Sequence, residues 1–74
     1  MKLAKCPLHT RAQIVDVSVD GRFDLRLQEL GVRVGAKFSV VNKAAFGGRV
    51  LNIAGTRIAV DHRSLQQISV AAIQ

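Results

Sequence analysis

The side chains with the most reactive chemistry in this sequence are one cysteine and two histidines. Cys6 and His9 form a C-x-x-H pair, and His62 is the only other soft ligand. Thiolate and imidazole groups bind Zn²⁺ and Fe²⁺, but a structural zinc site takes four ligands and a catalytic site takes three. We therefore expect no bound cofactor, with Cys6 as a small apolar anchor and His9 on the surface. A weak Fe²⁺ or Zn²⁺ site formed by Cys6, His9 and His62 is the alternative.

The sequence contains no arrangement of residues that is typical of catalysis. Most of the five acidic residues fall at predicted turns or on solvated faces, and no two of them form a clear acid and base pair. Ser64 and Ser69, the serines within range of His62, fall on the predicted surface. The glycine pairs lack the Lys-Ser/Thr of a phosphate-binding loop and the GxGxxG frame of a dinucleotide site. The sequence therefore predicts that the protein is not an enzyme.

The positive charge is the clearest indication of a binding role. Eleven Lys and Arg against five Asp and Glu give a net charge of +6 on 74 residues. Such a field attracts nucleic acid, an acidic lipid surface or an acidic patch on a protein, although it also serves solubility alone. Binders of single-stranded nucleic acid usually stack bases on exposed aromatic side chains. Here Trp and Tyr are absent, Phe23 and Phe38 are assigned to the core, and only Phe46 lies in a loop.

Nucleic acid is therefore not the expected partner, but it remains an alternative. Phosphate contacts without sequence preference are open to the cations Lys37, Lys43, Arg49 and Arg57.

Short strands account for most of the chain. Residues 12–19 are rich in Val and Ile and predict a strand, with a bulge where the inward-facing parity switches. Asp20-Gly21 is the turn pair that follows. The other predicted strands are one around Phe38 and Val40, which point inward, and those at residues 49–54, 57–61 and 68–73. "AAFGG" is a hairpin loop, and residues 62–67 form a single helical turn in which Leu65 faces inward. Five short strands with tight turns favour an SH3-like or OB-like barrel, because closure removes exposed edges.

One helix is predicted between the first two strands. Phe23, Leu27 and Leu30 stand at i, i+4 and i+7, which predicts a helix over residues 22–30 with these three side chains buried. Gly31 is the expected left-handed stop of this helix. Gly35 suits the third position of a type II turn, where φ is positive.

The division of the chain follows from these elements. Residues 1–11 are interpreted as an N-terminal arm, and residues 12–74 as the barrel domain. No apolar run is long enough to cross a bilayer, and the start has no apolar segment typical of a signal peptide. A single cysteine forms no internal disulfide and suits a reducing compartment. We therefore expect a cytoplasmic protein.

The stretch "RLQELGVRVGAKFSVV" resembles the ferrous iron transport protein A family, the FeoA domain. The family's Arg-Leu, acidic residue, Leu-Gly, second glycine and β-branched strand recur here in order, and the resemblance extends over about residues 12–71. It implies an SH3-like barrel of about five strands with one short helix covering an open end. Val34 stands where the family usually has proline, and the family's basic strand end is reduced to Arg63. A docking surface therefore does not transfer in detail.

The resemblance also implies a function. It points to a non-enzymatic accessory protein of bacterial ferrous iron uptake, whose partner is the membrane transporter that carries a cytosolic GTP-binding domain. The contact area expected from the exposed cations and the hairpin loop consists of Arg22, Arg26, Arg33, Lys37 and Phe46. For Arg26 the alternative is a solvated side chain or a pair with Glu29.

Two further expectations concern assembly and a related class of proteins. An exposed Val41 and the end at residues 71–73 would support a homo-oligomer. The same fold occurs behind the DNA-binding part of iron- and manganese-dependent repressors. About nine residues precede the first strand here, so a repressor is not expected.

Overall fold

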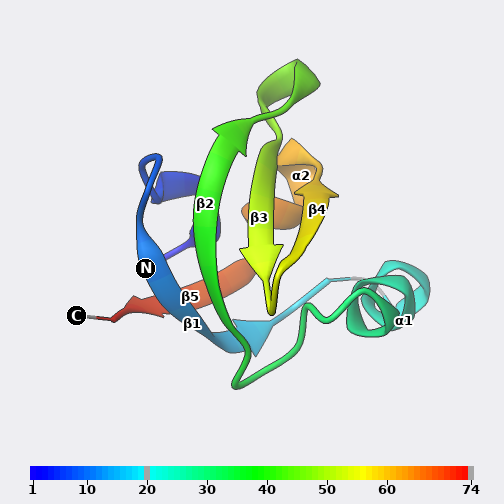
Figure 1. Ribbon diagram of the computed structural model, residues 1–74. Helices are drawn as coiled ribbons and strands as arrows, with labels where there is room; N and C mark the ends of the chain where they lie inside the picture. Colours follow the sequence, from blue (N-terminus) through cyan, green and yellow to red (C-terminus); the bar gives the residue numbers. More distant parts are fainter. Residues whose placement is uncertain (20, 74) are drawn as a thin grey trace.

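The computed structural model describes residues 1–19 and 21–73 (Figure 1). Asp20 of the predicted turn pair lies outside the described residues. The elements, in chain order, are η1 (Leu3–Lys5), β1 (Arg11–Val17), α1 (Gly21–Glu29), β2 (Lys37–Lys43), η2 (Ala45–Gly47), β3 (Arg49–Ile53), β4 (Thr56–Val60), α2 (His62–Leu65) and β5 (Ile68–Ala72). No helix in the described part of the chain is long and apolar enough to span a membrane.

The five strands form one antiparallel sheet in the order β4-β3-β2-β1-β5, which curls into an SH3-like barrel. The register shifts once in β1, between Ile14 and Asp16, and once in β2, between Val40 and Asn42. Bulges of this kind increase local twist and bend the sheet. The predicted barrel and the predicted bulge in the first strand are both confirmed.

The barrel is not closed by hydrogen bonds all the way round. Within residues 1–19 and 21–73, no strand ladder joins β4 to β5. The short helix α2 connects these two strands instead, and its Leu65 is completely buried, as predicted. One strand edge therefore remains beside an open seam, which differs from the full closure that the sequence argument assumed.

The N-terminal residues pack against the core. Leu3 and Cys6 are 0% and 1% exposed, and both belong to the segment interpreted as an arm. The backbone carbonyl of Met1 accepts a 2.7 Å hydrogen bond from the N–H of Val70, and Lys2 pairs with Ser69. Residues 1 and 2 thus extend the sheet along the outer edge of β5.

Helix α1 ends in a Schellman motif that fixes its C-terminal end to the core. Gly31 has φ 104° and donates a 3.0 Å bond to the carbonyl of Gln28, and the N–H of Val32 donates a 2.8 Å bond to the carbonyl of Leu27. The predicted stop at Gly31 is confirmed, because glycine adopts a positive φ without steric penalty. Leu27 and Val32 are both buried, which supplies the apolar contact that accompanies this motif.

Two tight turns fix strand register: one precedes β2, and the other joins β3 to β4. The N–H of Ala36 donates a 3.0 Å bond to the carbonyl of Arg33, and Gly35 has φ 92°, which confirms the type II turn. Ala54 and Gly55 have φ of 52° and 84° and join β3 to β4 as a two-residue hairpin loop. Positive φ at both central residues is typical of the turn whose twist matches that of paired strands.

The prediction that α1 buries Phe23, Leu27 and Leu30 together is wrong. Only Leu27 is buried, at 8% exposure, whereas Phe23 is 56% and Leu30 44% exposed. The nine-residue helix stands beside the barrel instead of lying flat on it (Figure 1). Because the anchor lies at its C-terminal end, only Leu27 reaches the core. Helical periodicity identifies which side chains share a face, but it does not say whether another element covers that face.

Candidate docking surface

Three hollows follow α1 along the open side of the barrel. The first lies between the N-terminal part of α1 and α2 and has a volume of about 310 Å³. The second, of about 210 Å³, lies between α1 and the end of β4. The third, of about 680 Å³, lies beneath the C-terminal end of α1, beside the β3–β4 turn. Concave apolar surfaces with a few polar groups are typical binding sites, so this side of the molecule is the candidate docking surface.

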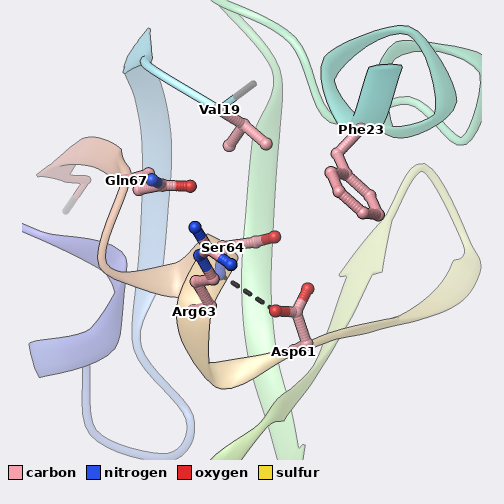
Figure 2. A pocket seen from close by; sticks show the side chains of 6 residues that line it. All are labelled: Val19, Phe23, Asp61, Arg63, Ser64 and Gln67. Atoms are coloured by element: carbon pink, nitrogen blue, oxygen red, sulfur yellow. Dashed lines mark hydrogen bonds between the residues drawn. The ribbon is translucent and has the colours of Figure 1, made fainter. Parts of the chain in front are cut away.

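The first hollow combines an apolar wall with a polar one (Figure 2). The ring of Phe23 projects from α1 toward Asp61 and Ser64, and Val19 closes the hollow from the end of the β1–α1 connection. Arg63 and Gln67 supply further polar groups from α2 and the residues after it. A ligand here would cover the exposed ring and meet both a cation and an anion.

Asp61 is held in place by its role as the N-cap of α2. Its Oδ2 accepts a 3.1 Å hydrogen bond from the backbone N–H of Ser64, as expected for a cap residue at the first turn of a helix. The hydrogen bond from the Ser64 side chain, followed by those from backbone N–H groups, lowers the pKa of the Asp61 carboxyl group below its usual value. Asp61 is therefore charged at neutral pH, and Arg63 two residues later provides the opposite charge.

The cations of the predicted contact area do not all line the same hollow. Arg26 lines the second hollow together with Phe23 and Leu30, whereas Arg33 and Lys37 line the third. Arg22 is exposed on α1, four residues before Arg26. These four cations therefore belong to α1, to the turn that follows it and to the first residue of β2.

Phe46 does not join them. It is 99% exposed in η2 with φ 56°, beyond the far end of β2 from Lys37 (Figure 1). Lys37 is the first of the seven residues of β2, and the six steps to the end of this strand correspond to about 20 Å at a rise of ~3.3 Å per residue. The expected contact area thus comprises two regions, an arginine-rich side at α1 and a hairpin tip with an exposed ring.

The three candidate metal ligands lie in different environments. Cys6 is buried, and desolvation raises the pKa of its thiol. His9 is exposed with φ 68°, and His62 is exposed next to Gln66 and the η2 loop residue Gly47. In the described part of the chain, no three His, Cys, Asp or Glu side chains are grouped so that they could hold a metal ion.

A small basic SH3-like barrel with an exposed helix side has the form of a binding domain. The FeoA domain matches residues 1–72, and the chain therefore belongs to the FeoA family. No curated protein matches the sequence.

Solved structures of proteins from this family are similar over nearly the whole chain. The FeoA protein of Chlorobium tepidum has a TM-score of 0.92 and 27% identity, with 100% of this chain and 71% of that chain covered. Iron(II) transport protein A of Clostridium thermocellum has a TM-score of 0.89 and 26% identity, with 99% and 46% covered. FeoA of Stenotrophomonas maltophilia, solved with zinc, has a TM-score of 0.78 and 29% identity, with 96% and 89% covered. This chain thus spans less than half of the length of the Clostridium thermocellum protein.

The fold also occurs in a manganese-dependent repressor, as expected from the sequence. A manganese-dependent transcriptional repressor has a TM-score of 0.87 at 15% identity, and this chain covers 41% of it. This likeness concerns the fold alone.

Sequence reasoning missed part of the candidate docking surface. Phe23 and Leu30 were assigned to the core, and Val19, Ser64 and Gln67 were not considered as lining residues. Arg63 was noted only as the remnant of a basic strand end. No local signal identifies these residues, because helical periodicity shows which side chains share a face and not whether another element covers that face.

Proposed function

We propose that this chain is a non-enzymatic accessory protein of bacterial ferrous iron uptake, which docks on the cytosolic GTP-binding part of the ferrous iron transporter. Membership of the FeoA family and the similarity to an iron(II) transport protein A connect the chain with ferrous iron transport. The Stenotrophomonas maltophilia FeoA is described as a prokaryotic SH3 domain protein and a candidate activating factor of ferrous iron transport. By this proposal the present chain acts in the same way, on the cytosolic side of the membrane.

The observation that carries the docking proposal is a face of α1 that no other element of residues 1–19 and 21–73 covers completely. Phe23 and Leu30 share one face of α1 and are 56% and 44% exposed, next to Arg22 and Arg26. Apolar side chains bordered by cations are typical of a surface that binds an apolar patch with an acidic rim. A net charge of +6 would also steer the chain toward an acidic partner.

Charge reversal tests this proposal. The double variant Arg26→Glu/Arg33→Glu removes two cations from the α1 side, and we expect at least tenfold weaker binding to the purified GTP-binding part at low salt, measured by calorimetry. The matched control is Lys5→Glu/Lys43→Glu, which changes the net charge equally at exposed positions on other elements. Equal binding of both variants and the parent chain would refute a docking site at α1. No binding by the parent chain would refute the docking itself.

A further inference from the structure

Strand β4 has a free edge with hydrogen-bonding groups directed away from the sheet. It is the last strand in the order β4-β3-β2-β1-β5, and Ile53 pairs with Thr56 across the two-residue turn. In an antiparallel ladder, alternate residues bond to the neighbouring strand and the others point away from it. Because the pair that flanks such a turn is hydrogen-bonded, Arg57 and Ala59 direct their N–H and C=O groups outward. Within the described residues, no backbone group outside β3 bonds to either of them.

At the opposite end of the sheet, the outer edge of β5 is paired with another part of the chain. Met1 and Lys2 pair along the outer edge of β5, so the chain covers that edge with its own backbone. Natural sheets usually cover, twist or charge their edges, since a free edge is a template for another strand. At β4, Arg57 and Ala59 are both exposed, and the neighbouring element is α1.

The space beside this edge has the composition of a peptide groove. The second hollow is lined by Ala59 and Val60 of β4 on one side and by Phe23, Leu27 and Leu30 of α1 on the other. Leu30, after the C-terminal end of α1, lines the third hollow together with Thr56 of β4, and Phe23 of α1 lines the first hollow together with Asp61, which follows β4. Addition of an extended peptide to an exposed sheet edge, with a pocket beside that edge for alternate side chains, is a recurring mode of peptide recognition.

We infer that β4 binds an extended, acidic segment of the partner protein as a sixth strand of the sheet. This inference specifies how the docking proposed above is made and rests on it. Backbone groups of Arg57 and Ala59 would supply the main-chain bonds, and one set of alternate side chains in the added strand would face the apolar wall of α1. The other set would meet Arg26 and Arg63, which line the first two hollows together with a single carboxylate, Asp61, and the exposed Arg57 of β4 adds a third cation.

The charge decides between the possible occupants of the groove. A second copy of this chain would bring another +6 to the edge and place Arg57 near its own counterpart. An acidic segment is attracted by the same field, and its affinity would fall as salt is added. The occupant is therefore assigned to a partner and not to a dimer.

Amide hydrogen exchange on the whole chain, with the purified GTP-binding part of the transporter as probe, tests the inference directly. Strand addition should slow exchange at Arg57 and Ala59 at least tenfold, with smaller changes at Ile58 and Val60, which already bond to β3. Docking by side chains alone would not protect these two amides. Binding without their protection would overturn the strand addition and leave the proposed function intact, whereas absence of binding would overturn both.

Proline at the edge gives a second readout. Ala59→Pro removes one outward N–H without breaking the ladder to β3, and proline is tolerated at an edge strand. We expect about tenfold weaker binding, since one lost hydrogen bond of ~1.4 kcal/mol corresponds to that factor. Ala59→Ser keeps the N–H and should bind like the parent chain. If Ala59→Pro does not fold, hydrogen exchange on the parent chain decides alone. Protection of Arg57 and Ala59 that rises with concentration in the isolated chain would overturn the inference in favour of self-pairing.

Discussion

Replacing Leu3 with alanine tests whether the N-terminal segment is part of the core. Leu3 is 0% exposed, although it lies in a segment that the sequence suggested as an arm. The substitution removes three buried carbons at about 0.8 kcal/mol each. The unfilled cavity adds to this loss, so we expect about 3–4 kcal/mol, within the range that Leu→Ala changes show in other cores. A domain of 74 residues has a free energy of unfolding of only about 4–11 kcal/mol.

Two variants on α1 provide the comparison. Leu25→Ala makes the same chemical change at 64% exposure, and we expect less than about 0.5 kcal/mol, because surface substitutions rarely exceed this. Phe23→Ala should cost about 1 kcal/mol, since less than half of the ring is buried. A buried Phe23, as the helical periodicity predicted, would instead cost about 3–5 kcal/mol.

Urea unfolding followed by far-ultraviolet circular dichroism is the suitable assay, because the chain has no Trp or Tyr for fluorescence. With a slope of about 1 kcal/mol per molar urea, Leu3→Ala should lower the midpoint by about 3 M. If Leu3→Ala does not fold, the volume-conserving Leu3→Met should still fold and lose less than about 1.5 kcal/mol. Equal losses for Leu3→Ala and Leu25→Ala, or a larger loss for Phe23→Ala than for Leu3→Ala, would refute the packing described above.

Three further outcomes follow from local contacts. Asp61→Ala should lose about 1 kcal/mol at pH 7 through the missing cap. Because the folded pKa of Asp61 is lowered, this difference should be fully present above about pH 4 and disappear as the pH falls through the folded pKa, which melts at pH 7 and pH 2 would show. Gly48→Ala would place a Cβ 2.8 Å from the carbonyl oxygen of Val60 and should lose about 1–3 kcal/mol in thermal melts. Gly21→Ala meets nothing within 4 Å and should be neutral or slightly stabilising. The Cys6 thiol is buried and has a raised pKa, so it should react with a disulfide reagent at pH 8 far more slowly in the folded chain than in urea. Because Cys6 is expected to be an apolar anchor, a Cys6→Ser variant should bind Zn²⁺ no more weakly than the parent chain.

The sequence predicted the conformation of several turns and the inward faces of several elements. Gly31 and Gly35 were expected at positive φ, and both adopt it. The alternation around Phe38 and Val40, the bulge in β1 and the helical turn that buries Leu65 were also predicted and are confirmed. These features depend on residues close in the chain, or on a periodicity that each element imposes by itself.

The candidate docking surface could be predicted only in part. The cations of α1 and of the following turn were identified, because charge and position off the apolar stripe are properties of the sequence. Phe46 and Lys37 stand at opposite ends of a predicted strand, so their separation of about 20 Å follows from the strand length, and a single contact area that contains both is wrong.

Tertiary structure alone decided which apolar side chains are covered. Leu3 and Phe23 are both large apolar side chains, yet the first is completely buried and the second is mostly exposed. Burial depends on whether a distant segment occupies the adjacent space, and here residues 1–6 fill the core near β5 while α1 meets it only at its C-terminal end. The same long-range pairing leaves β4 as the free edge, because strand order is set by contacts between residues far apart in the chain.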